Sequence, residues 1–258
     1  MSEHNVVIIE RDGALAVVTL NRPSVRNAFN AELRQAFAEA VADINADPAI
    51  RVAVLKGAGA GFCAGADLAE PFVGSITEQI EAEYKPFLTG IAEADTIWIA
   101  SVHGAAAGIG GALAMACDLM VMAEDASIYL AFAAIGLVPD GGATWQLLNA
   151  MGYRRAFETI IEGRRIAAVE CLAHGLANRL APTEQVHDEA LAWARSLVAG
   201  SPLAQKAAKR VLRHVGRMRL QDAITLEAKT QQPLVESEDF RNAVADFFAK
   251  RRPTFQGR

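Results

Sequence analysis

The stretch VHGAAAGIGGALAMACDL, residues 102–119, decides the fold class. The apolar run Ile97–Val102 that leads into it is typical of a buried strand, and Asp118–Ala123 at its far end has the same character. Between them, the glycine-rich loop Gly104–Gly111 is expected to open a short helix over Ala112–Cys117. A strand, a helix and a second strand in this order indicate an α/β protein.

The same alternation continues on both sides of this stretch. Further strands are predicted over 5–10, 14–20, 51–56 and 176–180, and helices after Asn30 and over 77–93, 143–151, 154–162 and 169–174. From about Thr183 the pattern is helical only, and Ser201-Pro202 is typical of a helix start. We therefore expect an α/β core over residues 1–200 and a helical region over 201–258.

Composition narrows the class of protein. Residues of the hydrophobic class make up 52% of the 258, which indicates a large buried core and excludes disorder. The net charge of −5 gives no reason to expect nucleic acid or an anionic membrane as partner. Three scattered cysteines, no signal-like N-terminus and no long apolar run predict a cytoplasmic protein without disulfides, zinc site or membrane span.

Glycine-rich loops follow three of the predicted strands, and their chemistry has two readings. None matches a dinucleotide or nucleotide-phosphate motif. They serve either as tight turns for close packing or as sources of free backbone N–H groups, two of which would form an oxyanion hole. In the third loop, GLVPDGG (136–142), Asp140 is either a turn residue or a catalytic carboxylate.

The chain resembles the crotonase superfamily, the enoyl-CoA hydratase/isomerase family. The resemblance rests on LNRPSVRNAFN (20–30), GFCAGADL (61–68), residues 102–119 and IGLVPDGGATWQL (135–147), together with the tail FFAKRRPTF (247–255). It implies a spiral of ββα units forming two roughly perpendicular sheets, with C-terminal helices that assemble a homotrimer or a hexamer of two trimers. It also implies an acyl-CoA substrate, with coenzyme A as part of that substrate and no other cofactor and no metal.

The resemblance also implies roles for individual residues. The backbone N–H groups of Ala66 and Ile109 would form the oxyanion hole. Three of the residues that the resemblance implies as substrate contacts also have a structural alternative. Asp67 would cap a helix, Arg26 would be a solvated loop residue, and Phe132 would be a core residue. The implied substrate and CoA contacts are Arg26, Ala28, Ala64, Gly65, Asp67, Leu68, Gly110 and Phe132.

The choice of reaction depends on three positions. The two glutamates of the family's hydratases correspond to Ala112 and Phe132, which cannot transfer a proton. Asp140 corresponds to the catalytic acid of certain enoyl-CoA isomerases and to an Asp of the ring-epoxide isomerases and of a dehalogenase, in which it is the nucleophile. An isomerase with Asp140 as acid/base is favoured, and burial would raise its pKa toward a useful range. A hydratase-like lyase of unusual mechanism is the alternative.

Two readings without catalysis stay open: a degenerate paralogue that binds acyl-CoA, and an RNA-binding paralogue. The basic residues between Lys206 and Arg219 are expected to form a solvated face, and the early helix is mostly acidic, which argues against RNA binding. His103 and Asp118 are expected to be structural. Acyl-chain specificity is expected to depend on Phe132 and on the segment Pro71–Lys85.

Overall fold

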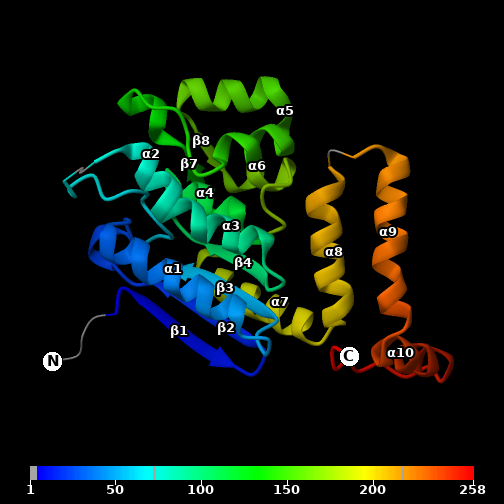
Figure 1. Ribbon diagram of the computed structural model, residues 1–258. Coiled ribbons are helices and arrows are strands. Elements are labelled where there is room, and N and C mark those ends of the chain that lie inside the picture. The colour runs from blue at the N-terminus through cyan, green and yellow to red at the C-terminus, as the bar shows by residue number, and fades with distance from the viewer. Residues whose placement is uncertain (1–4, 72–73, 217) are drawn as a thin grey trace. The chain divides into compact units, whose positions relative to one another are not determined.

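The computed structural model describes residues 5–71, 74–216 and 218–258. The chain divides into two compact units, Met1–Ala194 and Arg195–Arg258, and the division falls inside helix α7 (Val186–Val198). Figure 1 shows the elements of both units. The boundary expected after residue 200 lies in the short connection between α7 and α8 (Pro202–Val215).

The first unit is built on a six-stranded sheet in the order β1-β2-β3-β4-β6-β9. β1 and β2 form an antiparallel hairpin, and every other neighbouring pair is parallel. The predicted strand over 97–102 coincides with β4. The strands are β1 (Val7–Asp12), β2 (Leu15–Leu20), β3 (Val52–Gly57), β4 (Ile97–Val102), β6 (Leu119–Ala123) and β9 (Arg179–Ala181).

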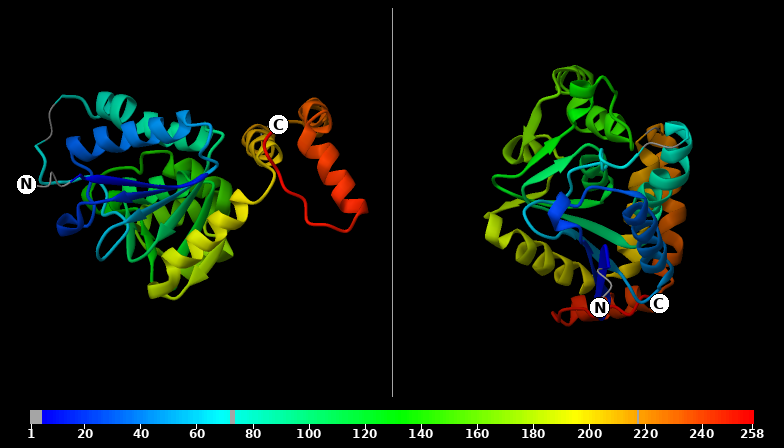
Figure 2. Two further views of the ribbon diagram at one scale, coloured as in Figure 1. Left: turned by 90° about the horizontal axis from the view of Figure 1, so that it is seen from below. Right: turned by 90° about the vertical axis from the view of Figure 1, so that its left-hand side faces the viewer.

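Helices cover both faces of this sheet, as β4 demonstrates. Trp98 Nε1 donates a hydrogen bond to Asn45 Oδ1 of α1 (Ala31–Ala46) at 3.1 Å, while Ser101 Oγ lies 2.7 Å from His187 Nδ1 of α7. Residues three apart on a strand point to opposite faces, so α1 and α7 lie on opposite sides of the sheet, as Figure 2 shows. Burial on both faces explains why all six residues of β4 are buried.

A second, three-stranded sheet has the order β5-β7-β8, with β5 parallel and β8 antiparallel to the central β7. Its strands are β5 (Ala105–Ala107), β7 (Ser127–Tyr129) and β8 (Arg165–Ala167). The expectation of a loop over 104–111 is therefore wrong in part, and α4 (Ile109–Ala116) begins at Ile109 rather than at Ala112. Three alanines have little intrinsic strand preference, so this strand depends on its tertiary partners.

The helices of the first unit differ from expectation in one place. The predicted helix over 77–93 is interrupted by a π-helical turn, Ile80–Tyr84. The break expected between the predicted helices 143–151 and 154–162 is present, because Gly152 has non-helical torsions inside α5. Residues 72–73 of the expected specificity segment lie outside the described residues. The remaining helices are α2 (Ile76–Gln79), α3 (Lys85–Glu93), α5 (Ala143–Glu162) and α6 (Ala168–Ala173), with 3₁₀ turns at Pro23–Val25, Ala131–Ile135 and Thr183–Gln185.

The second unit consists of α8, α9 (Leu220–Val235) and α10 (Glu238–Phe248). Ser201 and Ser237 cap α8 and α10 by accepting hydrogen bonds from the amides three residues on. The buried Asp239 carboxylate accepts hydrogen bonds from the amides of Gln256 and Gly257 and so holds the C-terminal segment to α10. None of the helices in the described residues is long and apolar enough to cross a bilayer.

Candidate active site

Two glycine-rich loops meet at the carboxyl ends of β3 and β4. Ligands commonly bind at this edge of open α/β sheets. The first loop runs from Gly57 to Leu68, and the second leaves β4 and passes through β5 to α4. The amide of Cys63 donates to the Ala105 carbonyl at 3.2 Å, and the amide of Ala107 donates to the Cys63 carbonyl at 2.8 Å. These bonds hold the two loops edge to edge.

The amides of Ala66 and Ile109 are free at this junction. The Phe29 amide donates to the Gly65 carbonyl at 2.8 Å, and the Phe29 carbonyl accepts from the Asp67 amide at 3.0 Å. In such a parallel bridge the Ala66 N–H points away from Phe29. Ile109 is the first residue of α4, so its N–H has no acceptor within the helix. Within residues 5–71, 74–216 and 218–258, neither amide donates a hydrogen bond.

The loops approach each other closely beside these two amides. Gly65 has a φ of +101°, and a β-carbon there would lie 2.9 Å from the Ala107 carbonyl oxygen and 3.6 Å from the Gly108 Cα. A side chain at residue 65 would therefore separate the loops. The glycine permits the close approach that two converging donors require.

A buried asparagine that the sequence did not single out holds the first loop in shape. Asn27 has no exposed surface, and its Nδ2 donates to the carbonyls of Ala58, Gly61 and Phe62 at 2.9, 2.9 and 3.1 Å. Its Oδ1 accepts from the Arg22 amide at 2.9 Å. Three carbonyls of a loop without regular structure thus obtain a partner inside the protein.

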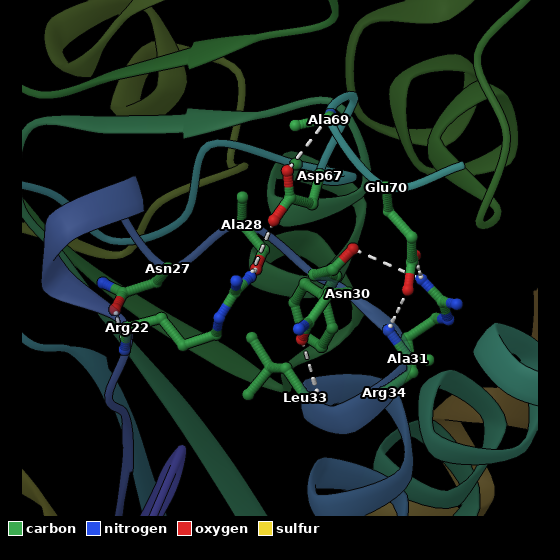
Figure 3. Close-up of polar contacts among 12 residues, drawn as sticks. Arg22, Asn27, Ala28, Asn30, Ala31, Leu33, Arg34, Asp67, Ala69 and Glu70 are labelled. Atoms are coloured by element: carbon green, nitrogen blue, oxygen red, sulfur yellow. Dashed lines mark hydrogen bonds and ion pairs between the residues drawn. The ribbon is translucent and has the colours of Figure 1, made fainter. Parts of the chain in front are cut away.

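The expected role of Asp67 is only partly correct. Its Oδ1 accepts from the Ala69 amide at 3.2 Å and so caps a turn, but no helix begins there. As Figure 3 shows, its Oδ2 pairs with Arg22 Nη1 at 3.0 Å, and the same guanidinium donates to the Ala28 carbonyl. Asp67 is therefore engaged within the protein, in a cluster that joins the first loop to the segment before α1.

A second ion-pair cluster lies next to the first (Figure 3). Arg34 is 5% exposed, and its Nη1 contacts Glu70 Oε2 at 2.7 Å while its Nε donates to Glu83. Glu70 Oε1 also accepts from the Ala31 amide at 2.7 Å. Burial alone would raise the pKa of Glu70, but the hydrogen bonds from Arg34 and Ala31 lower it below its ordinary value.

Asp140 lies in the turn before α5, and its carboxyl group has an unusual environment. Its Oδ1 is buried without a hydrogen-bond partner in the described residues, while its main-chain carbonyl accepts from the Ala143 amide at 3.0 Å. Burial raises the pKa of Asp140 above its ordinary value, and its own backbone amide opposes part of that rise. A buried carboxyl group with a raised pKa is a candidate acid/base.

The turn that carries Asp140 packs against α4. A β-carbon at Gly141 would lie 2.5 Å from Ile109 Cδ1 and 2.9 Å from Ala112 Cβ. The acid thus lies beside the residue whose amide is free at the loop junction. Ala112 is completely buried at this contact. Phe132 lies near the start of the same helix, because its ring carbon Cζ is 3.9 Å from the β-carbon position of Gly108.

The other residues expected to contact substrate fall into two groups. Arg26, Ala64 and Leu68 are exposed, and the Arg26 carbonyl accepts from the Ala64 amide at 2.9 Å. Ala28 and Gly110 are buried. A β-carbon at Gly110 would lie 2.7 Å from Cys63 Sγ, so this glycine serves the contact between the loops.

Two polar residues near the loops have structural partners. His103 Nε2 lies 2.8 Å from the Gly59 carbonyl, and Asp118 Oδ2 accepts from the Trp98 amide at 2.9 Å. In the described part of the chain, no group of three or more His, Cys, Asp or Glu side chains could hold a metal ion.

The basic residues between Lys206 and Arg219 do not all form the solvated face that the sequence predicts, because Lys209 is buried. Arg217 lies outside the described residues.

Tyr84 is a candidate that sequence reasoning missed. It is 5% exposed, its hydroxyl has no hydrogen-bond partner in the described residues, and its pKa is raised by burial and, to a smaller extent, by the Asp140 carboxylate. No motif or periodicity identified it. Only the folded arrangement brings it toward Asp140.

Comparison with known proteins agrees with this architecture. Residues 10–258 match the family described as enoyl-CoA hydratase/isomerase, and the chain belongs to that family. The resemblance to the crotonase superfamily and the expected α/β fold with two sheets and a helical C-terminal part are thereby confirmed.

Relatives extend over nearly the whole chain. A protein of Rhodobacter capsulatus named as a probable enoyl-CoA hydratase is 36% identical, with 100% of both chains covered. The 1,2-epoxyphenylacetyl-CoA isomerase of Escherichia coli is 32% identical, with 93% of this chain and 94% of that protein covered. Among solved structures, an enoyl-CoA hydratase from Bacillus anthracis superimposes with a TM-score of 0.92 at 28% identity, with 98% and 100% covered.

Proposed function

We propose that this protein isomerises enoyl-CoA thioesters, by moving a double bond or opening a ring epoxide, with Asp140 as the acid/base. The observation that carries the proposal is the buried carboxyl oxygen of Asp140, which lacks a hydrogen-bond partner in the described residues and belongs to a turn that packs against the Ile109 side chain. A base for this reaction needs a raised pKa and a position close to the donors that stabilise the enolate. No cofactor or metal takes part, since coenzyme A arrives as part of the substrate.

The reaction divides between the carboxyl group and the backbone. The thioester carbonyl accepts hydrogen bonds from the Ala66 and Ile109 amides, and Asp140 removes a proton from the carbon chain. The electron pair moves onto the thioester oxygen as an enolate, and the proton returns at another carbon. Each preorganised donor lowers such a barrier by about 3 kcal/mol.

Hydratase chemistry is the second candidate, and the names of most of the similar proteins favour it. Adding water to an enoyl thioester requires groups that position the water and move its proton. The family's two glutamate positions correspond here to Ala112, which is packed against Gly141, and to Phe132. A hydratase reaction would therefore have to use Asp140 alone.

Replacing Asp140 tests the proposal. We expect Asp140→Asn to lower kcat for converting a 3-enoyl-CoA to the 2-enoyl-CoA by about 10²- to 10⁴-fold, because the amide cannot accept the proton. The assay follows the conjugated thioester by ultraviolet absorbance, with 2-enoyl-CoA and 1,2-epoxyphenylacetyl-CoA tested in parallel. Asp12→Asn is the matched control, since it makes the same change at the exposed end of β1.

The outcomes separate the candidates. Isomerisation that survives Asp140→Asn would remove Asp140 from the mechanism. Rapid hydration of 2-enoyl-CoA without isomerisation would favour the hydratase. If no substrate is turned over but acyl-CoA binds, the chain is a degenerate binding paralogue.

A further inference from the structure

Tyr84 has the features of a ligand-binding group that the protein itself leaves unused. It ends the π-helical turn Ile80–Tyr84, a feature often found at functional sites. The side chain is buried, yet its hydroxyl has no hydrogen-bond partner in the described residues. Since a buried hydroxyl without a partner is unfavourable, a ligand atom that accepts its hydrogen bond would gain affinity.

The ring of Tyr84 is held in place from three sides. Phe29 and Phe87 pack edge-on against it, with ring centroids 6.2 and 5.9 Å away. The Arg34 guanidinium carbon lies 5.6 Å from its centroid, and Arg34 is itself bound to Glu70 and Glu83. The hydroxyl is therefore presented by a rigid group of neighbours rather than by a mobile side chain.

Tyr84 precedes a residue of α3 that contacts the Asp140 turn. Leu88 follows Tyr84 by one helical turn, and its Cδ1 would be 3.3 Å from a β-carbon at Gly141. The charge of Asp140 is also one of the smaller causes that raise the pKa of Tyr84. Tyr84 Oη and Asp140 Oδ1 do not bond to each other, and each lacks a hydrogen-bond partner in the described residues.

The phenol is a donor at neutral pH. Burial raises the pKa of Tyr84 to about 12; Arg34 opposes this rise without reaching hydrogen-bond geometry, and Asp140 and Glu70 add to it. A protonated phenol beside a carboxylate can bind an oxygen atom that accepts a hydrogen bond. The thioester oxygen already has its own donors at Ala66 and Ile109, so this oxygen belongs to another part of the acyl group.

We propose that Tyr84 selects acyl-CoA substrates that carry an oxygen on the acyl chain near the carbons on which Asp140 acts, such as a hydroxyl or an epoxide at the third carbon. The inference rests on the proposed function only in treating the Asp140 turn as the acyl site. Tyr84 donates a hydrogen bond to the substrate oxygen and transfers no proton.

Binding of two ligands that differ by one oxygen tests this proposal. Calorimetry compares 3-hydroxyhexanoyl-CoA with hexanoyl-CoA, neither of which needs isomerisation to be bound. The wild-type protein is expected to prefer the hydroxylated ligand by about 10-fold, and Tyr84→Phe to abolish that preference while affinity for hexanoyl-CoA changes less than about 3-fold. Tyr153→Phe is the control, since Tyr153 is 68% exposed and stacks on Phe157.

Stability measurements distinguish binding from a structural role. Because Phe keeps the ring and removes only an unpartnered hydroxyl, Tyr84→Phe is expected to retain or raise Tm; a lower Tm would show that the hydroxyl supports the fold and would overturn the proposal. A wild-type protein without the preference, or a variant that keeps it, would also overturn it. Loss of isomerisation in every assay would refute the proposed function alone, because the oxygen preference is measured without turnover.

Discussion

Three buried side-chain atoms in the described residues lack a hydrogen-bond partner: Tyr84 Oη, Asp140 Oδ1 and His103 Nδ1. Other buried polar groups nearby are satisfied, as the four hydrogen bonds of the Asn27 side chain demonstrate. Each unsatisfied atom costs roughly 1–3 kcal/mol of folding free energy. Two of the three belong to residues of the candidate site, where a bound ligand would supply the missing partner.

The ionisation of Asp140 makes a prediction about activity and pH. Its pKa is raised by burial, so a base at this position ionises above the ordinary value of about 3.9. We expect kcat/KM for isomerisation to fall on the acid side, with a midpoint above that value. Pre-steady-state or initial-rate profiles between pH 4.5 and 8 measure it. A rate that stays constant down to the lowest pH at which the fold persists would contradict the assignment.

The same shift predicts the opposite trend in stability. The folded protein favours protonated Asp140, so this contribution to the free energy of unfolding is fully present below about pH 3.9 and is lost as pH rises through the raised pKa. Asp140→Asn should therefore have a higher Tm than the wild type at pH 7.5 and a smaller advantage at pH 4.5. Thermal melts at the two pH values, with Asp12→Asn as control, complete this test.

At the scale of elements, the contact between the Asp140 turn and α4 sets the position of the Ile109 amide. Gly141 has a φ of +59°, and a β-carbon there would lie 2.5 Å from Ile109 Cδ1 and 2.9 Å from Ala112 Cβ. Gly142 has a φ of +82° but nothing within 4 Å of its β-carbon position. Substituting each of these two glycines by alanine therefore distinguishes the effect of backbone strain from the effect of packing.

We expect Gly142→Ala to lower the free energy of unfolding by about 1–2 kcal/mol, through left-handed backbone strain alone. Gly141→Ala should lower it by about 1–3 kcal/mol more, because the new methyl group overpacks the contact. Gly141→Ala should also reduce kcat, because Ile109 and the start of α4 must move. Urea unfolding and the isomerase assay measure both effects. Equal stability and activity of the two variants would show that the turn does not position α4.

Sequence pattern predicted the elements that are long or periodic. β4 and α1 were evident because an unbroken apolar run and a capped amphipathic helix are local signals. β5, β7 and β8 were not, because three-residue strands form only through their partners in the second sheet. The π-helical turn over Ile80–Tyr84 was likewise missed, since nothing local distinguishes it from the surrounding helix.

The candidate site could likewise be predicted only where its residues lie on local sequence motifs. The free amides of Ala66 and Ile109 and the carboxyl group of Asp140 lie on motifs that carry the family resemblance. Asn27 lies within one of those motifs but was not singled out, because its hydrogen bonds reach carbonyls more than thirty residues away. Tyr84 lies outside the motifs, and its importance arises from packing against Phe29 and Phe87.

At the scale of the whole molecule, the second unit lacks a core of its own. Across residues 195–216 and 218–258, no large apolar side chain is buried. Leu212, Leu220, Phe247 and Phe248 are each more than 70% exposed. Exposed apolar residues of this number indicate a surface that a partner covers.

We expect that partner to be a further copy of the chain, in the homotrimer or hexamer that the family resemblance implies. Light scattering coupled to size exclusion should then give a mass three or six times the 27.5 kDa of one chain. Ile224 is 55% exposed on α9 and lies one turn after Leu220, so Ile224→Asp would bury a charge against apolar partners and dissociate the assembly. Thr225→Asp adds the same charge one residue later, about 100° around the helix, and should leave the assembly intact. A monomeric wild type, or equal behaviour of the two variants, would show that α9 does not form the interface.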